Sequence, residues 1–247
     1  MGKLTGEHCA VFFAGFDLTG RSRQFDFNQE WDEEDMTAFQ DGSHNSLPSL
    51  PKGSVNVVSF LDGAANQSHV ALKAPGTRSG QVVLVGIGDG AAPTVGDVML
   101  ALQAEQFRYQ TPLETARAVI ANWNAMGEGH QPDDGILLIN TTITNTTNGT
   151  AHDHGAATAE GGAGYLEVVG GLATDTYAVK IQHAPDAAGS PGTWADLLSF
   201  TLDASARSSE RVAVAAGTTV NQWLRVVATR TGAAADNFRL AAGFARH

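Results

Sequence analysis

The chain has 247 residues, with 15 lysines and arginines against 26 aspartates and glutamates, and a formal net charge of -11 at pH 7. A chain of this length can bury an adequate core as one large β domain or as two ordinary domains, and we favour two. The acidity argues against binding nucleic acid, because that affinity depends largely on basic side chains that displace counterions from phosphates. No apolar run could span a bilayer or act as a secretion signal, so the sequence predicts a soluble protein made in a cytoplasm.

The negative charge is concentrated in the first half of the chain. Residues 1–135 hold 8 basic and 17 acidic side chains, a net charge of -9, whereas residues 136–247 hold 7 and 9. A like-charged wall would let DNA pass without holding it. Acidity that only maintains solubility explains the composition equally well. Cys9 is the single cysteine, which excludes an internal disulfide and indicates a small buried apolar side chain.

Strand patterns dominate the chain. Runs of β-branched and aromatic residues, most of them bounded by Gly, Pro, Asn or Asp, predict strands. These runs lie at residues 11–18, 23–28, 55–60, 70–73, 81–87, 165–169, 177–183, 198–202, 211–215, 222–229 and 237–244. The predicted fold class is therefore mainly β: an antiparallel β-sandwich or barrel with one packed helix, followed by a second, C-terminal β-sandwich.

Residues 30–53 form a predicted loop of over 20 residues, which is unusually long for a compact domain and indicates function or disorder. It carries four adjacent acids, Asp32, Glu33, Glu34 and Asp35, and several apolar residues. Exposed apolar residues of this kind are typical of a surface that a partner buries. The interface candidates are Trp31, Met36, Phe39, Leu47 and Leu50. A loop folded back onto its own sheet is the alternative.

One helix is predicted, at residues 94–107. Thr94 suits an N-cap with Asp97 three residues on, and an apolar stripe follows at helical spacing through Val95, Val98, Met99 and Leu102. The alanine and arginine content of residues 114–125 favours a helix.

A change of amino-acid composition between residues 140 and 164 predicts a domain boundary. Threonine, asparagine and glycine dominate this stretch and cannot bury much surface, so it reads as a linker or a surface strand. We place the boundary near residue 145, which gives domains at 1–145 and 146–247.

No motif predicts chemistry. The glycines at 86, 88 and 90 follow a strand, but their spacing is not that of a dinucleotide loop and Pro93 intervenes before the predicted helix. His152 and His154 would share one face of a strand without an obvious third metal ligand nearby. The four adjacent acids repel one another rather than form an acid–base pair. We expect no enzyme activity, no catalytic residue, no cofactor and no metal.

The hairpin at 11–28, the acidic stretch at 31–39 and the return through 47–53 to the strand at 55–60 resemble the opening of the major tail tube proteins of long-tailed, siphovirus-type bacteriophages. Residues 179–184, 194–197 and 223–227 are similar to the C-terminal halves of related phage tail proteins. The resemblance implies a structural virion protein with one helix beside its sheet. It also implies a closing strand at 119–123, so residues 114–125 are ambiguous between helix and strand, and we predict a strand there. The protein would assemble in the host cytoplasm into stacked rings, which form the tail tube through which DNA is ejected.

The resemblance also implies partners and roles. The loop at 30–53 would reach an adjacent ring, and Asp32, Glu33, Glu34 and Asp35 would line the lumen. The partners would be further copies of the chain, a tape measure protein and a tail terminator, with DNA passing unbound and no membrane involved. A ring of six tube domains is a hexamer if only residues 1–145 are tube-like, and a trimer with pseudo-sixfold symmetry if both halves are. We lean slightly to the trimer.

The main alternative is a binding module. The sandwich at 164–247 would then present aromatic side chains to a carbohydrate or a host surface, the candidates being Trp194, Trp223, Tyr165 and Tyr177. Aromatic residues in alternating strands belong more often to a core. An enzyme of β architecture is a third class.

Overall fold

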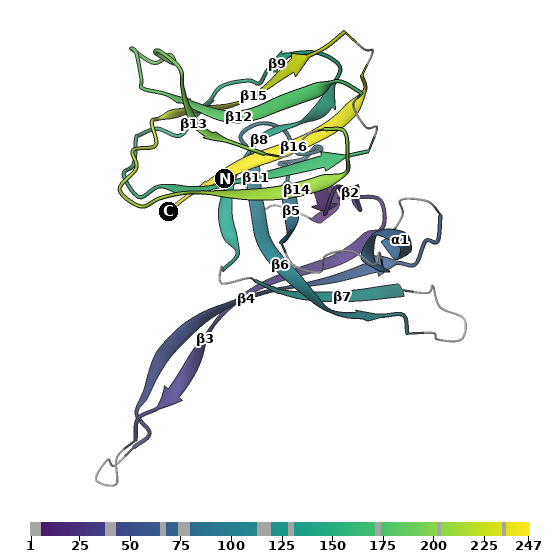
Figure 1. The fold of residues 1–247 in the computed structure, drawn as a ribbon. Helices are drawn as coiled ribbons and strands as arrows, with labels where there is room; N and C mark the ends of the chain where they lie inside the picture. The colour runs from purple at the N-terminus through teal and green to yellow at the C-terminus, as the bar shows by residue number, and fades with distance from the viewer. Residues whose placement is uncertain are drawn as a thin grey trace.

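The computed structural model describes residues 6–37, 43–64, 68–73, 80–112, 120–127, 131–170, 174–201, 204–233 and 236–247. Its strands are β1 Cys9–Phe13, β2 Phe16–Asp17, β3 Ser22–Asp35, β4 Ser46–Phe60, β5 Gln81–Ile87, β6 Val98–Gln110, β7 Ile120–Gly127, β8 Asp133–Ile143, β9 Thr147–Asn148, β10 His152–Asp153, β11 Gly162–Val169, β12 Thr176–Ala184, β13 Ala195–Ser199, β14 Ser208–Val214, β15 Trp223–Thr231 and β16 Phe238–Arg246. A 3-10 turn, η1 Gly6–His8, and a short helix, α1 Ser68–Lys73, complete the described elements. The predicted fold class, mainly antiparallel β, is confirmed (Figure 1).

The strands form two sheets. The main sheet has eleven strands: β14-β11-β16-β8-β6-β5-β1-β2 in one path, with β7, β4 and β3 continuing in turn from β6. The outer sheet has the order β10-β15-β12-β13, and β9 also pairs with β15. The main sheet curls, so that its two ends form separate layers, and the outer sheet covers one of them (Figure 1).

Three apolar cores separate these layers. The first lies between the outer sheet and the β11, β16 and β8 strands, and includes Ile181, Val226 and Phe244. The second lies inside the curl, where Phe12 and Leu84 meet Tyr165. The third, the barrel core, lies between β1, β5 and β6 on one side and β3, β4 and α1 on the other. Strands β5 and β11 therefore have buried side chains on both faces, which explains why β5 from Val82 to Ile87 has no polar side chain and why Glu167 is the one charged residue of β11.

The predicted helix at 94–107 is wrong. Residues 98–110 form β6, which pairs with β5, β7 and β8. Met99 and Ala101 face the second core while Leu102 and Ala104 face the barrel core, so burial on both faces mimics a helical stripe. The expected capping contact exists, because the Thr94 amide donates to Asp97 Oδ2 at 2.7 Å, but it closes a turn before the strand.

Two further expectations need correction, and a third is confirmed in part. Residues 70–73, predicted as a strand, belong to α1. No strand is predicted between residues 87 and 165 apart from the one at 119–123, yet residues 133–143 form β8, whose residues 140–142 are polar. In the ambiguous segment the strand prediction is confirmed for residues 120–125, which lie in β7, while residues 114–119 lie outside the described residues. None of the helices that the structure describes is long and apolar enough to cross a membrane.

Strand pairing crosses the predicted domain boundary near residue 145. Strand β8, on the N-terminal side, pairs with β16 along the range from Ile136 to Ile143. Leu138, Ile139 and Ile143 of β8 belong to the same core as the C-terminal strands. The division into 1–145 and 146–247 stays a prediction, and the core of the second part includes residues of the first.

The tight turn between β1 and β2 joins the layers. Ala14 and Gly15 adopt positive φ angles of 49° and 80°, and the Gly15 amide donates a 2.6 Å hydrogen bond to the carboxyl group of Glu167 in β11. Glu167 is fully buried. Burial raises the pKa of this carboxyl group well above its ordinary value, and hydrogen bonds from the amides of Gly15 and Ala14 only partly oppose the effect.

The buried carboxyl group makes a pH-dependent contribution to stability. Because the pKa of Glu167 is higher in the folded than in the unfolded chain, its contribution is complete below the unfolded value of about 4.3 and is lost as pH rises through the folded value. Glu167→Gln keeps the shape but cannot ionise. Urea unfolding from pH 4 to pH 8 should therefore show the variant gaining stability relative to the wild type as pH rises. A stability difference that does not change with pH would contradict this assignment.

Candidate assembly site: a protruding hairpin

Strands β3 and β4 run beyond the body as a two-stranded hairpin. Strand β7 pairs with β4 only over residues 54–60. Farther out, β3 and β4 pair only with each other, from Gln29 opposite Gly53 to Asp35 opposite Ser46. We call residues 30–37 and 43–53 the arm. Its β4 side spans about 25 Å at the usual strand rise of about 3.3 Å per residue, and it extends the main sheet beyond the rest of the molecule (Figure 1).

The long loop predicted at 30–53 is therefore wrong in its structure, because most of it is paired strand. The aromatic and charged residues of β3 continue a regular ladder instead of folding back onto the sheet. The Gln29 side chain fixes the base of the arm by donating to the Pro132 carbonyl at 2.8 Å. One irregularity, between Trp31 and Glu33, shifts the register by an extra residue on β4.

The arm exposes apolar side chains that nothing in the described structure covers. Trp31 is 56% exposed, Met36 54%, Leu47 51% and Leu50 70%. These are four of the six large apolar side chains classed as exposed on the described residues, so exposure is concentrated here. Phe39, the fifth interface candidate, lies outside the described residues. A two-stranded hairpin is only marginally stable alone in water, which favours an arm that is supported by a partner.

Polar contacts across the arm hold its strands together. Lys52 forms an ion pair with Asp32, and the Ser46 hydroxyl donates to Glu33 at 2.8 Å. The amide and hydroxyl of Thr37 both donate to Asp35. These bonds lower the pKa of the Asp35 carboxyl group, which keeps it ionised over a wider pH range. All of these groups are exposed or half-exposed, so each contact contributes little stability.

The four acids lie on both faces of the arm. Side chains alternate along a strand, so Glu33 and Asp35 share the Trp31 face, whereas Asp32 and Glu34 share the other. With Glu30 the arm carries five acidic groups against one lysine, Lys52. The role of lining a lumen stays a prediction, and because the two pairs lie on opposite faces it fits one pair at a time.

The edges of the arm differ. Strand β4 contains Pro48 and Pro51, which lack the backbone donor that a neighbouring strand would need. Strand β3 contains no proline over its 14 residues and pairs, among the described strands, with β4 alone. An unpaired edge of this length is suited to pair with another chain, although its acidic side chains oppose unselective pairing.

The aromatic residues of the alternative binding module are divided between the sheets: Tyr165 lies in β11 of the main sheet, whereas Tyr177 and Trp223 lie in β12 and β15 of the outer sheet and Trp194 directly precedes β13. Tyr165 and Tyr177 are 0% and 2% exposed and cannot contact a ligand. Trp194 is half-buried, and the Arg225 guanidinium lies 4.2 Å from its ring centroid. The Trp223 indole donates to Asp186 at 3.1 Å. The two tryptophans are thus already engaged by neighbouring charged side chains.

His152 and His154 lie side by side, but no third metal ligand is grouped with them among the described residues. Their rings meet edge to face with centroids 4.8 Å apart. Burial, with the nearby Arg246 cation, lowers the pKa of His154 to about 3, so the ring is neutral at pH 7. The same cation would repel a metal ion. Within the described ranges no three His, Cys, Asp or Glu side chains are grouped to hold a metal.

Comparisons with known proteins give little further information. No family model matches the chain, and no curated protein is significantly similar to it. Among solved structures, the chain is similar to the Dit protein of phage SPP1, described as a paradigm of the hub adsorption apparatus in phages that infect Gram-positive bacteria. The match covers 97% of this chain and 99% of that one, at 9% identity and a TM-score of 0.32. A similarity this low carries no argument about function.

Proposed function

We propose that the protein is a structural component of a phage tail that assembles with copies of itself into rings, which stack into a hollow tube. The observation that carries the proposal is the arm: a long ribbon whose β3 edge pairs with no described strand other than β4, and whose apolar side chains are exposed. A free monomer would expose these groups to water at a cost, whereas a sister chain would cover them. That this assembly is a tail tube follows from the resemblance of the sequence to tail tube proteins.

The arm is the element that reaches the next copy. Trp31 and Leu50 supply the apolar anchors, and aromatic anchors of this kind usually dominate the energy of an interface. The unpaired edge of β3 supplies backbone groups for pairing between chains. A tape measure protein and a tail terminator would be further partners of such a tube, and DNA would pass through it without being bound. The assembly forms in the host cytoplasm and becomes part of the virion tail.

Two ring designs remain within the proposal. A hexamer would use the barrel around the third core as its repeating unit, with the outer sheet outside. A trimer would need two tube-like units in each chain. Both place six units around one hole.

Negative-stain images of purified protein test the proposal, because rings or tubes with a central hole are expected. Compact single particles at every concentration would contradict it.

The acidic pairs allow a matched test of DNA passage. In phage particles, Glu33→Gln with Asp35→Asn removes two acids from one face of the arm, and Asp32→Asn with Glu34→Gln removes two acids from the other, where Glu30 remains. If one face lines the bore, only its variant should slow DNA ejection, by about tenfold, the lower range of electrostatic effects on rates. Ejection kinetics measured by dye release would check this. If neither variant changes ejection, the electrostatic role of the arm fails.

A further inference from the structure

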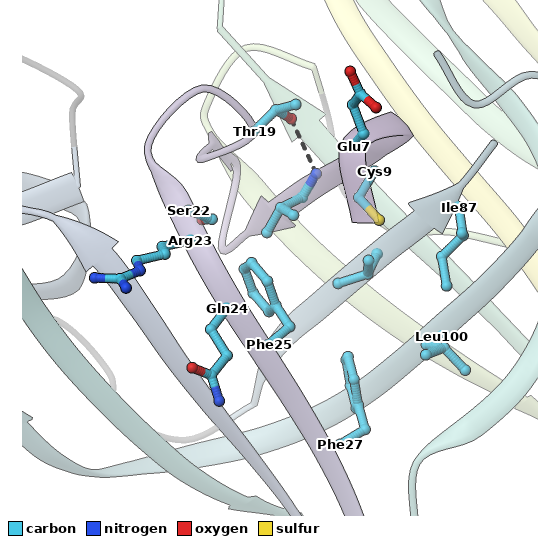
Figure 2. Close-up of a pocket in the computed structure, with 12 residues that line it drawn as sticks. Glu7, Cys9, Thr19, Ser22, Arg23, Gln24, Phe25, Phe27, Ile87 and Leu100 are labelled. Atoms are coloured by element: carbon cyan, nitrogen blue, oxygen red, sulfur yellow. Dashed lines mark hydrogen bonds between the residues drawn. The ribbon is translucent and has the colours of Figure 1, made fainter. Parts of the chain in front are cut away.

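A cavity of about 450 Å³ opens at the root of the arm, between β3 and the face of β1, β5 and β6. Its inner wall is apolar and its rim is polar. The wall consists of Val11, Phe25, Phe27, Val85, Ile87 and Leu100, and the rim includes Glu7, Thr19, Ser22, Arg23 and Gln24. Figure 2 shows Phe25 and Phe27 projecting from β3 toward the opposite strands, while Arg23 projects away. Cys9 also lines the cavity.

The cavity exists because the barrel does not close here. The outer side of β1 pairs with β2 only through Phe12 and Phe13, and β3 pairs only with β4 among the described strands. Water in a space of this size would amount to roughly 15 molecules at about 30 Å³ each, and the apolar wall offers them no hydrogen bonds. An apolar side chain from outside would fill the space at lower free energy.

The apolar wall of the cavity continues into the arm. The β3–β4 register is unbroken between Gln24 and Trp31. Because strand side chains alternate, Phe25, Phe27 and Trp31 lie on the same face of β3. Trp31 stands four residues beyond Phe27, about 13 Å along the strand, and is more than half exposed. It cannot fold back into the cavity of its own chain while β3 stays paired.

Building on the self-assembly proposed above, we infer that this cavity receives the arm of a second copy, with Trp31 of that arm inserted against Phe25, Phe27 and Leu100. Two unfavourable features, an apolar cavity open to water and an exposed tryptophan, are then removed by one contact. The cavity rim carries one cation, Arg23, and one anion, Glu7. Glu33, which shares the Trp31 face of the arm, would pair with the exposed Arg23 and lie clear of Glu7. The occupant is a second copy of this chain.

The single cysteine of the protein reports on the cavity. Burial raises the pKa of the Cys9 thiol, so it reacts slowly but measurably at mildly alkaline pH. In dilute, unassembled protein a small maleimide should modify it. In assembled protein the modification should be at least about tenfold slower, since the inserted arm covers the thiol. Trp31→Ala should make the rate independent of protein concentration.

A second experiment attaches a bulky group to the Cys9 thiol to block the cavity. A bulky maleimide attached to Cys9 in dilute protein should prevent assembly without unfolding the chain, as judged by circular dichroism. The matched control is Cys9→Ser with Val70→Cys, which carries the same adduct on the exposed face of α1 and should assemble normally. Normal assembly with Cys9 blocked would overturn the inference.

The outcomes separate this inference from the proposed function. Assembly with an equally reactive Cys9 would mean that the arm docks elsewhere, and the proposed function would stand. No assembly at any concentration would remove both. A thiol that is already unreactive in dilute protein would mean that the chain fills its own cavity, and would overturn the inference alone.

Discussion

Trp31→Ala combined with Leu50→Ala is expected to stop assembly while leaving the protomer folded. Burying a large apolar side chain contributes about 1.5–3 kcal/mol, so losing both should weaken association by roughly 100- to 10,000-fold. Both side chains are more than half exposed in the single chain, so the protomer loses little packing. Light scattering across a concentration series measures the loss of association.

The control for this variant is Val70→Ala. Val70 is also exposed, at 38%, but lies on α1, away from the arm. The Val70→Ala variant should assemble like the wild type. The melting temperatures of the wild type, the double variant and the control should agree within a few degrees. Tubes of normal length from the double variant would show that the exposed apolar residues of the arm are not the contact between copies.

Gly15→Ala is expected to cause the largest loss of stability among single substitutions in the turn between β1 and β2. Gly15 has a φ of 80°, and an added Cβ would lie 2.6 Å from the Ser208 amide nitrogen and 2.8 Å from the Val168 carbonyl oxygen. Both are backbone atoms that cannot move aside alone. The left-handed conformation costs about 1 kcal/mol and the overlap about 1–3 kcal/mol, so we expect a loss of about 2–4 kcal/mol in the free energy of unfolding.

Gly90→Ala is the matched control, because Gly90 has the same φ of 80° but nothing lies within 4 Å of its added Cβ. It should lose only about 1 kcal/mol, the cost of the backbone conformation. Chemical denaturation of both variants measures the difference. Equal losses would mean that the turn is not packed against β11 and β14, and that the contact between the layers is wrong.

The sequence predicts a strand correctly where a short run of apolar residues is bounded on both sides by turn-forming residues. Strand β5 matches the predicted range 81–87, because seven residues rich in valine are bounded by glycines. It failed at β6, where Met99 and Leu102 face different cores and their spacing imitates a helix. It failed at β8, because pairing with β16, far along the chain, makes a strand of polar residues such as Asn140 and Thr142.

The composition of residues 30–53 identifies the candidate site, but the sequence predicts a loop where the structure has a paired hairpin. Trp31 and Leu50 were identifiable as interface candidates, because apolar residues among charges and prolines are unusual in a long loop. That the segment is a paired ribbon depends on the ladder between β3 and β4, whose alternation is obscured by the acids and by the register shift at Trp31. The cavity could not be predicted, since its wall unites Val11, Phe27, Val85 and Leu100 from four strands.

The central claim is that the arm is incomplete in a single chain and is covered by a sister chain. Hydrogen–deuterium exchange at low and high protein concentration tests it most directly. Amides of residues 30–37 and 43–53 should exchange quickly when the protein is dilute and become protected as copies associate, while those of β5 stay protected throughout. Arm amides that exchange at one rate across all concentrations, in a protein that stays monomeric, would contradict the claim.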